Sequence, residues 1–170
     1  MTAAEATSAN ILAEESREDR EEILAMLERA YWMEIETVMS YIAASTNPDG
    51  VRAEQVKASL RGDIAEELGH AQRFAARIKE LYGVVPGSQR LQAEQSFLQP
   101  PADQTDIVHV VRGVIEAERQ AIDHYSRIIE RTEHADPVTQ DMVIEILHDE
   151  QGHLRLFEGF LREYDGPAAG

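Results

Sequence analysis

Apolar residues recur at helical spacing along four long stretches of this chain. The first stretch starts at Ser16 or Asp19, and the four stretches cover about residues 16–45, 53–82, 105–132 and 138–164. Apolar positions three and four residues apart are typical of amphipathic helices that bury one face. The pattern therefore predicts an all-α protein with four long helices.

Helix-breaking residues separate these stretches. The turn signals are Asn-Pro-Asp-Gly at 47–50 and His-Ala-Asp-Pro at 134–137, while Gly83 ends the second stretch and Asp-Gly-Pro at 165–167 ends the fourth. Because the segments 47–50 and 134–137 are short, the helices on either side of each should pair as antiparallel hairpins.

The second and third helices are separated by a longer segment, residues 83–104, with Gly83, Pro86, Gly87, Pro100 and Pro101 and a possible short helix at about 91–97. About 20 extended residues span roughly 60–70 Å, whereas a helix of about 28 residues is roughly 42 Å long. The segment can therefore carry the chain back along the bundle. The sequence predicts a four-helix bundle with a long crossover between helices 2 and 3.

Composition limits the class of protein further. The 170 residues suit one domain, which we place at 19–164, between a flexible arm (1–18) and a flexible tail (165–170). Cysteine is absent, which excludes disulfides and thiolate metal sites. The net charge of −16 disfavours nucleic acid and favours cations. No long apolar run or signal-like start is present, so we expect a cytoplasmic protein that does not enter membranes.

One glutamate interrupts the apolar stripe of each predicted helix. These are Glu34, Glu67, Glu118 and Glu150. Residues seven apart share a helix face. The eight residues seven positions before or after these glutamates are all apolar or aromatic: Leu27, Tyr41, Leu60, Phe74, Val111, Tyr125, Val143 and Phe157. The four carboxylates should therefore point into the core. Glu36 and Glu116 fall on solvated or intermediate faces by the same test.

A histidine follows two of these glutamates by three residues. Glu67 and His70 form one Glu-x-x-His pair, and Glu150 and His153 form the other. A lone pair of this kind usually lies on a solvated face. Here it occurs twice, with Glu34 lying 33 residues before Glu67 and Glu118 lying 32 residues before Glu150. Four buried carboxylates would be unstable without cations. The six residues Glu34, Glu67, His70, Glu118, Glu150 and His153 therefore predict a dinuclear metal site, and their oxygen and nitrogen ligands suit iron or manganese.

Other candidate residues lie outside this set. The remaining histidines, His109, His124, His134 and His148, lie off the stripe and are predicted at the surface. Tyr41 and Tyr125 are predicted to be core residues whose hydroxyls reach partners in the layer around the metal ligands, with a redox role as the alternative. Trp32 is predicted to serve packing or a subunit contact.

Two motifs resemble those of a known superfamily. The segments EELGHAQRF (66–74) and MVIEILHDEQGHLRLFE (142–158) look like the ferritin-like superfamily, with bacterioferritin and Dps-like ferritins closest, over about residues 19–162. The resemblance implies a ferritin-like four-helix bundle holding two iron ions. Glu67 and Glu150 would bridge the irons, Glu34 and Glu118 would be terminal ligands, and each histidine would bind one iron.

The chain departs from bacterioferritin in two places. Bacterioferritin binds haem through a methionine directly after the helix-2 glutamate, and Leu68 stands there, so haem is not expected. The chain also ends 17 residues after His153, too soon for the fifth helix of 24-subunit cages. We therefore expect a homo-oligomer of 12 subunits in preference to 24 or a dimer. The cysteines of rubrerythrins and thioferritins are missing.

The functional expectation is a di-iron ferroxidase that oxidises Fe(II) with dioxygen or hydrogen peroxide and stores or detoxifies iron. The same ligands would also serve a di-metal peroxidase or catalase, or an oxygen-activating enzyme, of rubrerythrin or manganese-catalase type. A helical scaffold whose acids are only structural is a third alternative, which predicts no bound metal.

Overall fold

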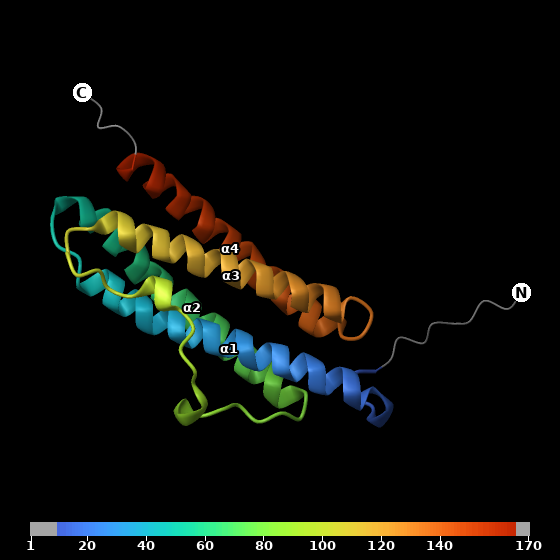
Figure 1. The fold of residues 1–170 in the computed structure, drawn as a ribbon. Coiled ribbons are helices and arrows are strands. Elements are labelled where there is room, and N and C mark those ends of the chain that lie inside the picture. The colour runs from blue at the N-terminus through green and yellow to red at the C-terminus, as the bar shows by residue number, and fades with distance from the viewer. Residues whose placement is uncertain (1–9, 166–170) are drawn as a thin grey trace, which may run out of the picture.

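The structure, a computed structural model, describes residues 10–165, and these residues form four long helices and no strand (Figure 1). The helices are α1 (Arg17–Thr46), α2 (Glu54–Glu80), α3 (Ile107–Thr132) and α4 (Pro137–Tyr164). The predicted all-α four-helix bundle is confirmed. Among the described residues, none of the helices combines the length and apolar character needed to cross a lipid bilayer.

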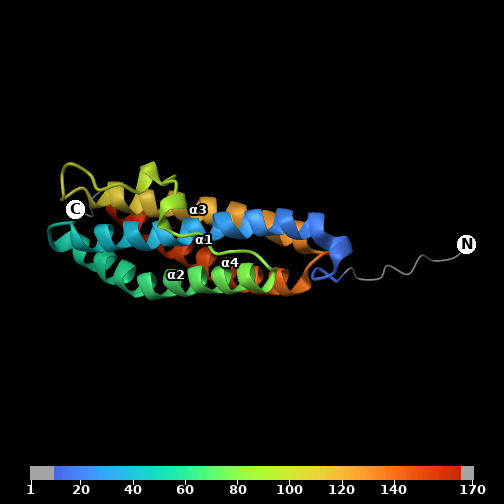
Figure 2. The same cartoon turned by 90° about the horizontal axis from the view of Figure 1, so that it is seen from below.

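The helices pack as two antiparallel hairpins, α1 with α2 and α3 with α4 (Figures 1 and 2). The α1–α2 turn includes Gly50, whose positive φ of 92° favours glycine. From the end of α2 the crossover returns alongside α1 to the opposite end of the bundle, where α3 begins (Figure 1). Helices α2 and α3 therefore run in the same direction, as the length of the crossover predicts.

The crossover lacks the short helix predicted at 91–97. It forms two separate 3-10 turns instead, Ser88–Arg90 (η3) and Ser96–Leu98 (η4). The second turn packs on α3, where Leu98 is buried in the core. A Cβ at Gly113 of α3 would lie 2.8 Å from the carbonyl oxygen of Phe97, so glycine allows this close approach. Contact with α3, which is remote in sequence, fixes the conformation of this part of the crossover.

Helix α2 ends at Glu80, two residues earlier than predicted. Tyr82 takes the left-handed conformation (φ 65°) that glycine often takes after a helix. The following residue, Gly83, donates its N–H to the carbonyl of Ile78 at 2.8 Å. A Cβ on Gly83 would lie only 2.6 Å from Cδ2 of Leu24. Close packing against α1 therefore explains the glycine at 83.

The core consists of two clusters, one toward each end of the bundle. The first contains Tyr41, Leu60, Val111 and Phe157. The second contains Leu27, Phe74, Tyr125 and Val143. All eight side chains are fully buried, which confirms the heptad assignments. The four stripe glutamates lie between these clusters along their helices, so the polar layer is enclosed by apolar layers above and below.

The bundle begins earlier than the predicted boundary at residue 19. Ile11 is buried, and the guanidinium of Arg20 donates to the carbonyls of Ile11 and Ala13, both at 2.9 Å. A short 3-10 turn, Glu14–Ser16 (η1), then leads into α1. Residues 10–16 therefore pack on the bundle and do not belong to a flexible arm. The remaining predicted arm, 1–9, and the tail, 166–170, lie outside the described residues.

Candidate metal centre

The structure brings all six predicted site residues together in the middle of the bundle. Their exposed fractions do not exceed the 9 % of His153. One comes from α1, two from α2, one from α3 and two from α4: Glu34, Glu67, His70, Glu118, Glu150 and His153. Residues three apart on a helix lie on the same side. For this reason each Glu-x-x-His pair points into the bundle with both of its side chains.

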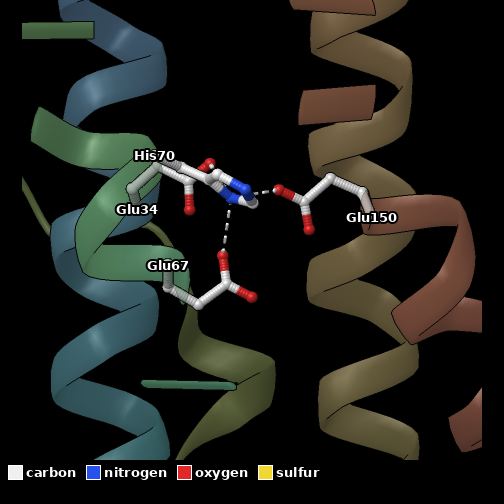
Figure 3. Close-up of side chains that lie close together, drawn as sticks. All are labelled: Glu34, Glu67, His70 and Glu150. Carbon is white, nitrogen blue, oxygen red and sulfur yellow. Dashed lines mark ion pairs between the residues drawn. The ribbon is translucent and has the colours of Figure 1, made fainter. Parts of the chain in front are cut away.

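His70 faces three of the carboxylates (Figure 3). Its Nδ1 lies 3.1 Å from Oε1 of Glu150 and 3.4 Å from Oε2 of Glu67. The same nitrogen is 3.8 Å from Oε1 of Glu34. The ligand atoms of these four residues all lie within 4.8 Å of one another, which is close enough for a shared metal ion.

His153 has the equivalent surroundings in the other half of the site. Its Nδ1 lies 3.2 Å from Oε1 of Glu67 and 3.4 Å from Oε2 of Glu150, and 3.8 Å from Oε1 of Glu118. Glu67 and Glu150 therefore each present one oxygen to His70 and the other to His153. This division makes two adjacent four-residue groups that share both carboxylates.

The polar atoms at the centre support metal binding. Among the described residues, Oε1 of Glu67, Nδ1 of His70, Oε1 of Glu150 and Nδ1 of His153 are buried without a hydrogen-bond partner. Buried polar atoms normally have partners, because leaving one unsatisfied costs about 1–3 kcal/mol. Here the unsatisfied atoms are carboxylate oxygens and imidazole nitrogens that face one another. This is the donor set that iron and manganese accept.

Two tyrosines fix the outer carboxylates of the site. The hydroxyl of Tyr41 on α1 donates to Oε1 of Glu118 on α3. The hydroxyl of Tyr125 on α3 donates to Oε1 of Glu34 on α1. Burial and the neighbouring carboxylates raise the pKa of both hydroxyls well above the usual value, so both remain protonated donors at neutral pH. Both tyrosines are core residues, as predicted, and their hydroxyls contact the carboxylates of Glu118 and Glu34 directly.

Two further carboxylates, which the sequence reasoning missed, contact the outer nitrogens of the histidines. Nε2 of His70 lies 3.4 Å from Oδ2 of Asp149, and Nε2 of His153 lies 3.2 Å from Oε2 of Glu66. Each acid directly precedes Glu67 or Glu150 and lies on the helix opposite the histidine that it contacts. A carboxylate in this position orients the ring so that Nδ1 points at the centre. An acid repeated directly before both glutamates was the signal available in the sequence.

Without metal, protons neutralise part of the cluster. Burial and the charges of Glu150 and Glu67 raise the pKa values of Glu34 and Glu118 well above the usual range. Burial opposes the charge on the histidines, but contacts with Glu150 and Glu67 raise the pKa of His70 to about 10 and that of His153 to about 12. Burial would raise the pKa of Glu67 too, yet His153 and His70 lower it to about 2. At neutral pH both imidazoles therefore carry protons, and the raised pKa values of Glu34 and Glu118 favour the protonated form of these two carboxyls.

Two predictions about neighbouring residues are wrong. Glu36 was expected on a solvated or intermediate face, but it is buried and accepts hydrogen bonds from the backbone N–H groups of Glu94 and Gln95. His124 was expected at the surface, but it is buried, with Nε2 2.9 Å from the carbonyl of Met26. Burial lowers the pKa of His124, so the ring is neutral. In both cases a remote segment covers the side chain.

The exposure of the other residues outside the six-residue cluster agrees with the sequence predictions. The histidines predicted at the surface besides His124 are exposed: His109, His134 and His148. Glu116 is partly buried on α3 and accepts a hydrogen bond from Gln120, away from the six-residue cluster. Trp32 is partly buried and packs against Tyr31.

Comparison with known proteins places this geometry in a family. Residues 24–166 match the ferritin family profile, described as a ferritin-like domain. The chain belongs to the ferritin family. A curated relative of this ferritin-family chain is the DNA protection during starvation protein of Pyrococcus furiosus, 29 % identical over 152 residues, covering 88 % of this chain and 82 % of the relative. Bacterioferritin of Desulfovibrio desulfuricans is 30 % identical over 154 residues, covering 84 % and 76 %.

Solved structures of ferritin-family proteins share the fold. The dodecameric thioferritin of Bacteroides fragilis superposes with a TM-score of 0.77 and 25 % identity, covering 86 % of this chain and 88 % of that one. The D. desulfuricans bacterioferritin, whose structure was solved with its diiron site in different catalytic states, gives a TM-score of 0.75 and 21 % identity, covering 89 % and 85 %. The predicted resemblance to bacterioferritin and Dps-like ferritins is confirmed.

Proposed function

We propose that this protein is a di-iron ferroxidase, which oxidises Fe(II) with dioxygen or hydrogen peroxide and stores or detoxifies the product. The observation that carries the proposal is that Glu67 and Glu150 each present one carboxylate oxygen to His70 and the other to His153. Two carboxylates whose oxygens face different histidines suit two metal ions held side by side.

The geometry suggests a role for each ligand. Glu67 and Glu150 would be the bridging carboxylates, because both contact both histidines. Glu34 belongs to the group that contains His70. Glu118 belongs to the group that contains His153. These two would be terminal ligands, held in place by their tyrosines. The complete set is the six residues predicted from the sequence, with iron as the favoured metal and manganese as the alternative.

The reaction balances with either oxidant. Two Fe(II) ions lose one electron each, and dioxygen takes up both electrons and two protons to become hydrogen peroxide. With hydrogen peroxide as the oxidant, two electrons and two protons give two molecules of water. The protein holds the two ions close enough for both electrons to reach one oxidant molecule.

Assembly into a cage would provide the storage part of the function. The relatives include a dodecamer, and this chain exposes apolar side chains on α1 that a second copy could cover: Met39 is 61 % exposed and Ile42 is 51 % exposed. We favour a homo-oligomer of 12 subunits over 24 or a dimer. Leu68 occupies the position where bacterioferritin has its haem methionine, so we propose that no haem is bound. The acidic composition disfavours nucleic acid as a partner.

A stoichiometry experiment tests the proposal. The freshly purified protein is analysed for iron and manganese and then receives aerobic Fe(II) at hundreds of ions per subunit. If the protein stores iron, it should stay in solution with far more than two ferric ions per chain. Light scattering should then give a particle whose mass is a multiple of the subunit mass. Saturation at two metals with sustained peroxide turnover would favour the peroxidase, catalase or oxygen-activating alternative. A protein that binds no metal would disprove both.

A further inference from the structure

Two cavities lie in succession between the surface and the metal centre. The outer cavity has a volume of about 590 Å³ and lies between α1 and the crossover, with Trp32, Met33 and Glu94 in its wall. The inner cavity, of about 10 Å³, borders Glu34 and Glu118 as well as the two bridging-type carboxylates. That volume is about what one water molecule requires.

Met33 lines both cavities, and the crossover forms the partition beside it. Glu94 lines the outer cavity, and the next residue, Gln95, lines the inner one. The wall of the inner cavity on α3 includes two small side chains, Ala117 and Ala121, beside Glu118 and Tyr125. Met33 and Ala121 are partly exposed. The inner cavity therefore approaches the surface between α1 and α3 at this point.

Hydrogen bonds hold the partition in place. The carboxylate of Glu36 accepts the backbone N–H of Glu94 at 2.9 Å and that of Gln95 at 2.8 Å. The side-chain amide of Gln95 donates to Oγ1 of Thr37 at 2.7 Å and accepts from Oγ of Ser40 at 3.3 Å. Gln95 is 5 % exposed although it belongs to the crossover. These contacts explain why the chain buries Glu36 on a helix face that the sequence marks as polar.

Charge distinguishes this side of the centre from the opposite side. At the outer cavity, Glu28 pairs with Arg90 at 2.8 Å and Arg29 pairs with Glu94 at 3.2 Å. The third acid in its wall, Glu36, accepts hydrogen bonds from two backbone N–H groups. Two arginines thus offset two of the three acids, which weakens the attraction of this cavity for a cation such as Fe(II).

On the histidine side, by contrast, acids lie beside the ligands. Carboxylate oxygens of Glu66 and Asp149 lie within 4.8 Å of a ring nitrogen of His70. Carboxylate oxygens of Asp63 and Glu66 lie within the same distance of a ring nitrogen of His153. Negative charge attracts cations and gives a neutral oxidant no advantage. The two sides of the centre therefore differ in the species that they favour.

From these observations we propose that the oxidant, a small neutral molecule such as dioxygen or hydrogen peroxide, reaches the metal centre from the side of α1 and the crossover, through the two cavities and past Gln95. This inference rests on the proposed ferroxidase function. Gln95 is a positioning residue of the route, since it contacts α1 and closes the inner cavity. Its replacement should alter oxidant access and leave metal binding unchanged.

The test uses protein that is loaded anaerobically with two Fe(II) per chain and then mixed with the oxidant, so that metal uptake does not affect the rate. Gln95→Ala widens the inner cavity and should raise the second-order rate constant by about ten-fold. Ala121→Leu fills the cavity and should lower it by about as much. The matched controls are Gln55→Ala and Ala58→Leu, two exposed residues of α2 that line neither cavity. Both should react at the native rate.

A bulkier peroxide tests directly whether the replacement of Gln95 opens the inner cavity. Tert-butyl hydroperoxide takes two electrons from two Fe(II) and two protons, giving tert-butanol and water. It should react slowly with the native protein and with Gln55→Ala, and much faster with Gln95→Ala. This comparison decides the question alone if Ala121→Leu does not fold.

Titration with Co(II), which should give two ions per chain, separates the two hypotheses. If the native protein and Gln95→Ala bind two Co(II) and oxidise Fe(II), yet rates and peroxide selectivity are the same in all variants, the proposed route is wrong and the ferroxidase stands. If the native protein binds fewer than two ions or does not oxidise Fe(II), the proposed function and the route both fail. Opposite rate changes in Gln95→Ala and Ala121→Leu, with unchanged Co(II) binding, support the route.

Discussion

The hydroxyl of Tyr41 lies 2.5 Å from Oε1 of Glu118 and joins a carboxylate of one hairpin to a tyrosine of the other. Tyr125 and Glu34 repeat the contact with the hairpins exchanged. Each tyrosine follows the stripe glutamate of its own helix by seven residues and contacts the stripe glutamate of the facing helix. The arrangement around the centre is therefore nearly two-fold symmetric.

This contact leads to the first prediction. Tyr41→Phe removes the donor that orients Glu118, so the affinity for Co(II) should fall by about 10–100-fold. The stability of the protein should change by only about 1 kcal/mol. Tyr125→Phe should behave alike, because it makes the equivalent contact with Glu34. Tyr82→Phe is the control, since its side chain is exposed. Unchanged Co(II) affinity in both core variants would remove the proposed role of the tyrosines.

The second prediction concerns two acids of α3, Glu116 and Glu118, that lie about half a helical turn apart. Glu118 is 2 % exposed and belongs to the metal-ligand group of His153, whereas Glu116 is partly buried and bonded to Gln120. Glu118→Ala should lose tight binding of one of the two Co(II) ions, and Glu116→Ala should keep both. Titration followed by visible absorption distinguishes the variants. Loss of metal only in Glu116→Ala would mean that the helix faces have been assigned wrongly.

The third prediction concerns protons released by metal. In the metal-free protein His70 and His153 are protonated at pH 7, and the raised pKa values of Glu34 and Glu118 favour protonation of these carboxyls too. Ligands must lose their protons to bind metal, so two divalent ions should release roughly two protons per chain from the histidines and more from the two carboxyls. Calorimetry at pH 7 in buffers of different ionisation enthalpy measures this number. Affinity should therefore rise steeply with pH. Release of no protons would contradict the proposed proton distribution.

The fourth prediction is the pH dependence of stability without metal. The folded-state pKa of His70, about 10, lies above its usual value of 6.5. Its stabilisation is therefore complete below about pH 6.5 and is lost as the pH rises toward 10. The raised pKa values of Glu34 and Glu118 act in the same direction above their usual 4.5. The unfolding free energy of the metal-free protein should fall between pH 7 and 10, and Zn(II) should reduce this fall. Urea unfolding at several pH values measures both.

The fifth prediction concerns a buried ion pair far from the metal centre. The guanidinium of Arg77 on α2 donates to both carboxylate oxygens of Asp136 at 2.8 and 2.9 Å and to Thr139 at 2.8 Å. Arg77→Ala leaves the fully buried Asp136 without its partner and should cost roughly 3–5 kcal/mol. Arg112→Ala breaks an exposed pair with Asp165 and should cost about 0–1 kcal/mol. Chemical denaturation compares the two, and equal losses would contradict the assignment.

The sequence predicts the parts of this structure that depend on local periodicity. Heptad spacing places Glu34 and Glu118 inside because the residues seven positions away, such as Leu27 and Val111, are apolar, and these are fully buried. Likewise the turn signal at 47–50 marks the end of α1. A helix face can be read in this way because its neighbours along the chain define it.

The parts that the sequence does not predict depend on contacts between remote segments. Glu36 shares its helix face with Arg29 and Ala43, which does not mark the face as buried, and residues 94–95 of the crossover cover it. His124 is buried where its ring meets the carbonyl of Met26, 98 residues away. Neither the path of the crossover nor the rotation of α3 against α1 is encoded in the periodicity of a single helix. The ligand roles within the cluster remain a proposal.

Glu67 and Glu150 belong to both four-residue groups, and this sharing has a mechanical consequence. Each four-residue group takes three members from one hairpin and one from the other. A metal ion in either group would thus tie the α1–α2 hairpin to the α3–α4 hairpin, while the crossover supplies none of the six side chains. Cleavage of the chain within the crossover should then leave two fragments that metal keeps together. Chelation would weaken that attachment, so the metal that the protein binds would also hold its two hairpins together.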